Sequence, residues 1–169
     1  MENDPLPSWN EGASKQAILD FVAAVMDEGG EQFVPEHDRI ATFDNDGTLW
    51  TEQPMYAQAY FILDQVKTLA PQHPEWTTEQ PYAAILADDH EAMKQFTEAD
   101  LGKLMTVAHS GMTTDEFDAQ ALAWAESAIN PLTKHLFTES IYQPQLELMD
   151  YLRANGFRTY IVSGGGIDL

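Results

Sequence analysis

The chain contains no cysteine, which excludes disulfide bonds, thiolate nucleophiles and cysteine-ligated zinc. Basic residues are also scarce, because 8 Lys and Arg stand against 28 Asp and Glu, giving a formal net charge of −20. We therefore expect no nucleic acid and no membrane surface as a partner, since both attract clusters of positive charge. The excess of acidic residues by itself is typical of a well-solvated surface.

Long apolar runs are missing too, so the sequence predicts no membrane span. Residues 1–13 have neither the basic nor the apolar segment of a signal peptide. Localisation therefore stays open: cytoplasmic for the sequence as given, and periplasmic or exported if a signal peptide was removed. The hydrophobic content of 44%, with 11% aromatic residues, indicates a folded globule.

Two carboxylates stand two residues apart where an apolar stretch ends. Residues 39–43 predict a buried strand, and Asp44, Asn45, Asp46 and Gly47 follow it. In open α/β sheets ligands bind at the carboxyl ends of the strands, and neighbouring carboxylates repel unless a cation or a shared proton compensates. An ordinary turn explains the same residue types. The spacing alone leaves both interpretations open.

A family resemblance favours the first interpretation. The pattern Asp44-x-Asp46-Gly47-Thr48 after an apolar strand resembles the first signature of the haloacid dehalogenase superfamily. Far downstream, the segment 160–165 resembles its second signature, a buried strand that ends in a Ser and small residues, here Ser163 and Gly164. The wide separation is similar to that of phosphoserine-phosphatase-like members, which carry a helical cap between the two. The resemblance implies an α/β fold, with a partial Rossmann-like core of central parallel strands in residues 1–49 and 150–169 and an α-helical cap in residues 50–149.

The resemblance also implies a chemistry. Asp44 would attack phosphorus and form an aspartyl-phosphate, and Asp46 would protonate the leaving oxygen. Mg²⁺ would bind the carboxylate of Asp44 and the backbone carbonyl of Asp46. Ser163 and the amide of Gly164 would bind phosphoryl oxygens at a helix start, although a Ser in such a turn is otherwise a helix cap. Thr48 would steady the loop of Asp46.

The substrate implied by the resemblance is a small phosphorylated metabolite. Dehalogenases of the superfamily lack a second Asp at the position of Asp46, so Mg²⁺-dependent phosphomonoester hydrolysis is favoured. Glu52 lies near the place where phosphoserine phosphatases hold the substrate amine with a cap Glu. The predicted cap carries 15 acidic residues, four lysines and no arginine. This charge favours a broader or cationic-headed phosphomonoester over phosphoserine.

The printed chain stops at Leu169, before the third-signature Lys and the fourth-signature acidic pair that the resemblance implies. We therefore interpret it as truncated after the second signature and expect the 169 residues alone to be inactive or nearly so. The alternative function is that of a catalytically incomplete fragment that only binds metal or phosphate, or assembles with a partner. Self-association through an uncovered sheet edge is one such possibility.

Hydrophobic periodicity and capping signals predict the remaining elements. The five His residues are scattered and predict no metal site. The predicted elements are a helix capped by Ser14 and running to about Glu28, a helix whose apolar stripe is Tyr56, Ala59, Tyr60 and Leu63, helices over 82–96 and 98–109, a helix to about Ser127 that starts with a Thr113–Glu116 capping box, a helix opened by Pro144 with Leu148, Met149 and Leu152 facing inward, and a strand over 157–162.

Overall fold

The computed structural model describes residues 4–164, and they separate into two compact units. Residues up to Gln53 together with Thr138–Gly164 form the strand unit, and Pro54–Phe137 form the helical unit. By their contacts, residues 50–53 and 138–149 group with the strands. The predicted cap boundaries, at residues 50 and 149, stay a prediction.

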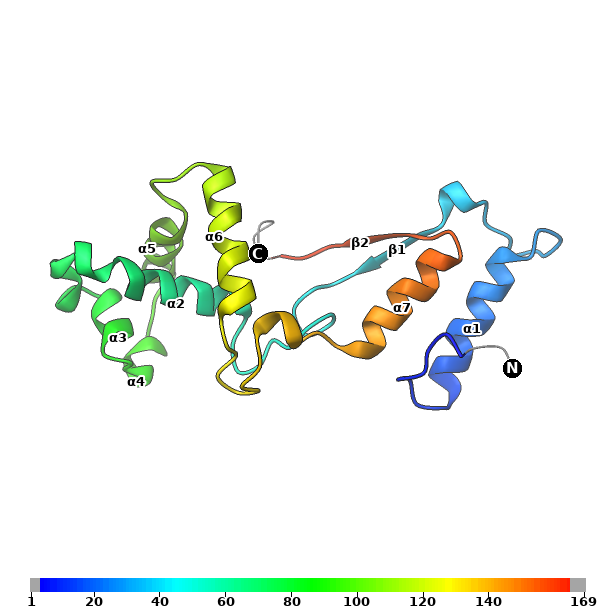
Figure 1. The fold of residues 1–169 in the computed structure, drawn as a ribbon, viewed down its shortest axis with the longest axis horizontal. Coiled ribbons are helices and arrows are strands. Elements are labelled where there is room, and N and C mark those ends of the chain that lie inside the picture. The colour runs from blue at the N-terminus through cyan, green and yellow to red at the C-terminus, as the bar shows by residue number, and fades with distance from the viewer. Residues whose placement is uncertain (1–3, 165–169) are drawn as a thin grey trace. The chain divides into compact units, whose positions relative to one another are not determined.

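The strand unit is built around two parallel strands, β1 (Ile40–Phe43) and β2 (Arg158–Ile161). Their register pairs Ile40 with Arg158 and Phe43 with Ile161. Helix α1 (Ala13–Met26) precedes β1, and α7 (Gln143–Ala154) leads into β2 and runs beside both strands (Figure 1). Between α7 and β2, Gly156 ends the helix with a positive φ of 79°, as the Asn-Gly stop signal predicts.

Apolar side chains from both helices and from β1 form the core of this unit. Met149 and Leu152 of α7 are buried and Leu148 packs against the cluster, which confirms the predicted inward face of that helix. The full set of buried members is Val22, Val25, Phe43, Leu49, Met149, Leu152 and Phe157.

The prediction that both strands are buried is wrong. Among the described residues, Phe43 is buried and Ala41 packs against the core, but Ile40 and Ile161 are 52% and 55% exposed. The reason is that successive residues of a strand point to opposite faces, and the described helices cover only part of this small sheet. The parallel pairing itself agrees with the predicted α/β class.

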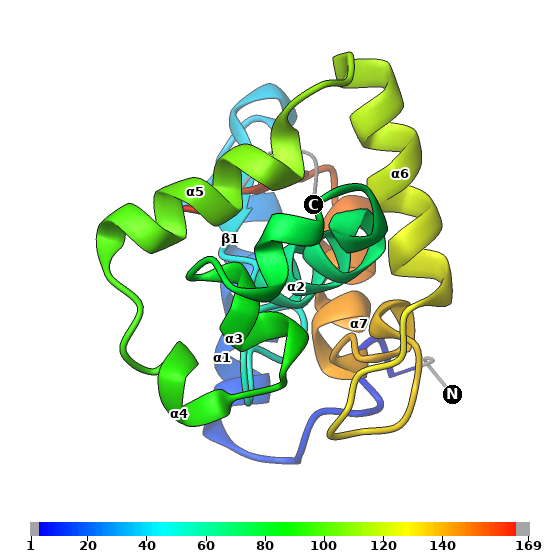
Figure 2. The same ribbon diagram turned by 90° about the vertical axis from the view of Figure 1, so that its left-hand side faces the viewer.

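The helical unit contains α2 (Ala57–Leu69), α3 (Tyr82–Leu86), α4 (His90–Met93), α5 (Glu98–His109) and α6 (Thr114–Ser127). Helix α2 lies in the middle, with α3, α5 and α6 around it (Figure 2). Phe61 of α2 is fully buried and makes edge-to-face contacts with Phe117 and Trp124 of α6, at ring-centroid distances of 5.7 and 5.5 Å. No helix within residues 4–164 is long and apolar enough to cross a membrane.

Two predicted helices of this unit are confirmed at their starts and one is corrected. Helix α5 has the predicted bounds, and Thr113 and Glu116 form the predicted reciprocal capping box of α6. The single helix over 82–96 is wrong: Asp88 adopts a φ of +49°, and Asp89 caps the separate helix α4. Asp tolerates the left-handed region better than most residues, so the chain turns there.

Two further local predictions are wrong. Helix α1 starts at Ala13 after Gly12, so Ser14 lies inside the first turn and is not the cap. On α2 the buried face contains Ala57, Phe61 and Ile62, whereas Tyr56 is 53% exposed. The predicted stripe is therefore rotated around the helix axis, because packing against neighbouring helices decides which face is buried.

Candidate active site

The two predicted signatures meet at the same end of the sheet. Asp44 directly follows β1, and Val162 and Ser163 directly follow β2. The backbone N–H of Val162 donates to the carbonyl of Phe43 at 2.7 Å, so the ladder continues one step past the last paired residues. Because the strands are parallel, Asp44 and Ser163 lie at the carboxyl edge, where ligands bind in open α/β sheets.

Residues 44–50 form a tight loop that closes on its own backbone. The N–H groups of Thr48 and Leu49 both donate to the carbonyl of Asn45, at 3.1 and 2.8 Å, which closes a tight turn. The N–H of Gly47 donates to the carbonyl of Trp50 at 2.9 Å, and Gly47 has a φ of +72°. The buried side chain of Leu49 joins the core and fixes the loop on the unit.

Each aspartate of the loop accepts one hydrogen bond from within it. The Oδ1 atom of Asp44, which is exposed, accepts from the backbone N–H of Asn45 at 2.9 Å. The Oδ1 atom of Asp46, which is half-buried, accepts from the indole Nε1–H of Trp50 at 3.0 Å. Within residues 4–164, no Lys or Arg forms a salt bridge with either carboxylate. The loop therefore carries two negative charges that the described residues leave uncompensated.

Glu52 lies against the same loop. A Cβ atom added to Gly47 would lie 2.8 Å from the carboxyl carbon of Glu52, so the carboxylate packs over the glycine. The chain around it is held by backbone pairing: Tyr142 N–H donates to Leu49 carbonyl at 2.8 Å, and Thr51 N–H donates to Ser140 carbonyl at 3.3 Å. This places a third carboxylate beside the turn.

The family model of haloacid dehalogenase-like hydrolases matches residues 41–166. The chain belongs to this family. The match includes Asp44, Asp46 and Ser163, so both predicted signatures lie inside it. Membership confirms the predicted superfamily and the α/β class and supports a hydrolase; the phosphoserine-phosphatase-like subgroup stays a prediction. A search of curated proteins finds no match.

The donor set at this edge fits the Mg²⁺ ion that such hydrolases commonly use. The carboxylate of Asp44 and the backbone carbonyl of Asp46 offer oxygen donors, and Asp44 is open to solvent. In the part of the chain that the structure describes, no group of three or more His, Asp or Glu side chains could enclose a metal. Mg²⁺ does not need such a cage, because it keeps several waters and binds through one or two carboxylates plus substrate phosphate.

The structure brings most of the predicted site residues of this hydrolase together. Asp44, Asp46, Thr48 and Glu52 all belong to the loop or its immediate continuation, and Ser163 lies at the neighbouring strand end. The contact that Thr48 makes in the loop comes from its backbone N–H. Gly164 is exposed, and the helix expected after it falls in residues 165–169, outside the described residues. The chemical roles of these residues stay predictions.

Sequence reasoning missed the part of Trp50. Its indole N–H donates a hydrogen bond to the carboxylate of Asp46. A signal was present, because a tight turn with a glycine at its positive-φ position can bring a donor a few residues after the second aspartate back toward it. That turn depends on Gly47, which the sequence did show.

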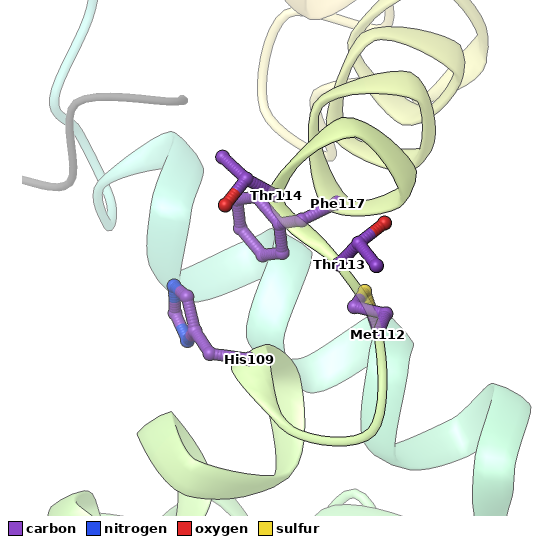
Figure 3. Close-up of a pocket in the computed structure, with 5 residues that line it drawn as sticks. All are labelled: His109, Met112, Thr113, Thr114 and Phe117. Carbon is purple, nitrogen blue, oxygen red and sulfur yellow. The ribbon is translucent and has the colours of Figure 1, made fainter.

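A small hollow lies in the helical unit, between the end of α5 and the start of α6 (Figure 3). Two of its lining residues already have polar partners: His109 Nδ1 lies 2.7 Å from the Met105 carbonyl, and the Thr113 hydroxyl donates to Glu116 at 3.0 Å. The backbone N–H and hydroxyl of Thr113 hold the pKa of Glu116 below its ordinary value. The hollow, of about 150 Å³, is thus a packing feature; its lining residues are His109, Met112, Thr113, Thr114 and Phe117.

Proposed function

We propose that this chain is a Mg²⁺-dependent phosphomonoester hydrolase that works through an aspartyl-phosphate on Asp44. The observation that supports the proposal most is the strand register, which pairs Phe43 with Ile161 and so sets Asp44 and Ser163 at one edge of the sheet. A nucleophilic carboxylate and a hydroxyl donor for phosphoryl oxygens are needed close together in phosphoryl transfer.

The residues divide the chemistry between them. The carboxylate of Asp44 forms a bond to phosphorus while the bond from phosphorus to the leaving oxygen breaks, and Asp46 gives its proton to that oxygen. Water then attacks the aspartyl-phosphate, Asp46 accepts a proton from it, and phosphate leaves. Ser163 and the amide of Gly164 hold phosphoryl oxygens. Mg²⁺, held by Asp44 and the carbonyl of Asp46, supplies charge neutralisation at the phosphoryl group.

Hydrolysis of p-nitrophenyl phosphate by the full polypeptide tests the proposal. We expect turnover with Mg²⁺, none with a chelator, and none in the Asp44→Asn variant. Asp38→Asn is the matched control, because it makes the same chemical change at an exposed residue just before β1, and it should keep full activity. Mass spectrometry of the acid-quenched enzyme should show one added phosphoryl group. An active Asp44→Asn variant would refute the nucleophile.

The second candidate function is metal or phosphate binding, or assembly, without turnover. The observation that favours it is the apolar exposure of the sheet at Ile40, Ile161 and Val162, since uncovered sheet edges recruit other chains. Calorimetric titration with Mg²⁺ and sedimentation separate the cases. Binding of Mg²⁺ without hydrolysis supports this candidate, and a compact monomer in solution speaks against edge-mediated assembly.

We further propose that the substrate is a small phosphorylated metabolite. It either comes from a broader range of phosphomonoesters than phosphoserine or carries a cationic head group. The formal net charge of −20 repels additional negative charge on a substrate and attracts a cationic group. We expect a higher kcat/KM for phosphocholine than for phosphoserine, with the difference shrinking as salt is added, because salt screens the interaction between exposed charges. A clear preference for phosphoserine would end this proposal. Nucleic acid and membrane surfaces remain excluded as partners in the proposal, on the same charge argument.

A further inference from the structure

We propose that Trp50 is a positioning residue that fixes the carboxylate of Asp46 and determines which of its oxygens carries the catalytic proton. This inference rests on the proposed function, because it assigns Trp50 a part in the same phosphoryl transfer. The observation that supports it directly is the 3.0 Å hydrogen bond from the indole Nε1–H of Trp50 to Asp46 Oδ1.

Trp50 is held in place by its backbone on two sides. Its carbonyl accepts the N–H of Gly47 at 2.9 Å, and it forms bridge pairings with Asp46 and with Ile141. A side chain whose backbone is fixed in this way delivers its donor to a defined point. The indole N–H therefore reaches back over the turn to Asp46, the residue with which the backbone of Trp50 also pairs.

Packing in the hydrophobic core does not explain the position of the indole. Leu49, the residue before it, is buried in the core cluster, whereas Trp50 is half-exposed and does not belong to that cluster. The polar end of a Trp finds a partner when it is partly buried, and here the partner is a carboxylate of the first signature. Removing the N–H should therefore change the site far more than the stability of the unit.

The chemistry of the donor selects one oxygen of Asp46. An indole N–H only donates, so the oxygen that it contacts must offer a lone pair. In the acid form the carbonyl oxygen accepts a hydrogen bond better than the hydroxyl oxygen does, so the contact favours Oδ1 as the carbonyl oxygen and places the proton on Oδ2. In the first step the Oδ2–H proton moves to the leaving oxygen as the bond from that oxygen to phosphorus breaks and the bond from Asp44 to phosphorus forms. The products are a neutral alcohol, the Asp46 carboxylate and the aspartyl-phosphate.

Leaving groups of different basicity test this role. An alkyl phosphate releases a basic alkoxide that needs the proton, whereas p-nitrophenyl phosphate releases a stable phenolate that needs it little. We expect Trp50→Phe to lower kcat/KM by about tenfold to a hundredfold for an alkyl phosphate such as phosphocholine, and by less than about threefold for p-nitrophenyl phosphate. The parameter kcat/KM is the right one, because it reports the steps up to formation of the covalent intermediate.

The chain offers a matched control in Trp9, whose indole N–H donates to the Pro144 carbonyl at 2.8 Å in the same unit. Trp9→Phe removes an indole hydrogen bond away from the loop and should lower kcat/KM for both substrates by the same factor or not at all. Equal losses for both substrates in Trp50→Phe would overturn the positioning role. Absence of all hydrolysis in the unmodified full polypeptide would instead count against the proposed function.

A spectroscopic measurement tests the contact without activity. In a ¹H–¹⁵N correlation spectrum each tryptophan gives one indole signal, and the signal missing in Trp50→Phe identifies that of Trp50. We expect Asp46→Ala to shift this signal and to leave the signal of Trp9 in place. An unmoved Trp50 signal would overturn the inference even in an active enzyme.

Discussion

Replacement of Gly47 by Ala perturbs the loop that carries both aspartates, and the structure gives two separate reasons for a loss of stability. The first is the backbone: Gly47 has a φ of +72°, where an L-residue with a Cβ costs about 1–2 kcal/mol. The second is contact, because the new Cβ would lie 2.8 Å from the carboxyl carbon of Glu52 and 3.0 Å from one of its oxygens. Glu52 must then leave its rotamer, at a further cost of about 0.5–1.5 kcal/mol.

A double-mutant cycle separates the two costs. We expect Gly47→Ala to lower the free energy of unfolding by about 1.5–3.5 kcal/mol in the unmodified chain. In a Glu52→Ala background only the backbone cost should remain, about 1–2 kcal/mol. The difference between the two losses is the coupling energy between the sites. Urea denaturation, followed by far-UV circular dichroism, measures all four proteins.

Gly102 is the control for this cycle. It lies inside α5, and a Cβ there would meet nothing within 4 Å. Gly102→Ala should raise stability by about 0.5–1 kcal/mol, because alanine loses less backbone entropy than glycine in a helix. The reasoning would be refuted if Gly47→Ala were as stable as the unmodified chain. If it lost the same free energy with and without Glu52, the contact between the two residues would be refuted and the backbone cost would stand.

Three further changes test other parts of the structure. Arg39→Met should lower the free energy of unfolding, measured by urea denaturation, by about 2–4 kcal/mol, because the buried guanidinium donates to two backbone carbonyls at 2.9 and 3.0 Å. The same change at the exposed Arg153 should lower it by less than about 1 kcal/mol. The capping hydrogen bonds lower the pKa of Glu116 in the folded state, so its stabilisation is complete above the ordinary pKa of 4.5 and is lost as the pH falls through the folded value. Glu116→Gln should therefore flatten the fall of the urea midpoint below pH 4.5. Phe61→Ala should cost about 3–5 kcal/mol, measured as the loss of helical circular dichroism in urea, because its fully buried ring contacts two aromatic rings.

The features that the sequence predicts well are those that depend on residues a few positions apart. The capping box of Thr113 and Glu116 needs only two side chains three residues apart. The turn after β1 needs only Gly47 and the carbonyl of Asn45. Both are local, so the residue types alone largely determine them.

The features that the sequence does not predict depend on what packs nearby. The buried face of α2 is set by Phe117 and Trp124, which belong to α6. The exposure of Ile40 is set by which helices cover β1. The bond from Trp50 to Asp46 requires both the tight turn at Gly47 and the pairing of Trp50 with Ile141, which is distant in sequence. Patterns of hydrophobicity contain none of these three relations.

The loop after β1 concentrates negative charge in a way that a purely structural turn does not need. The oxygen atoms of Asp44 and Asp46 that accept hydrogen bonds each receive one donor, from Asn45 and Trp50, and both donors are neutral. Glu52 adds a third carboxylate beside Gly47. Like charges held close together destabilise a folded chain unless something compensates them, and no Lys or Arg within residues 4–164 forms a salt bridge with any of the three. Under the proposed function, a Mg²⁺ ion held by Asp44 and the backbone carbonyl of Asp46 would supply that compensation. The cation that would offset the negative charge of the loop is therefore the same cation that the proposed chemistry needs.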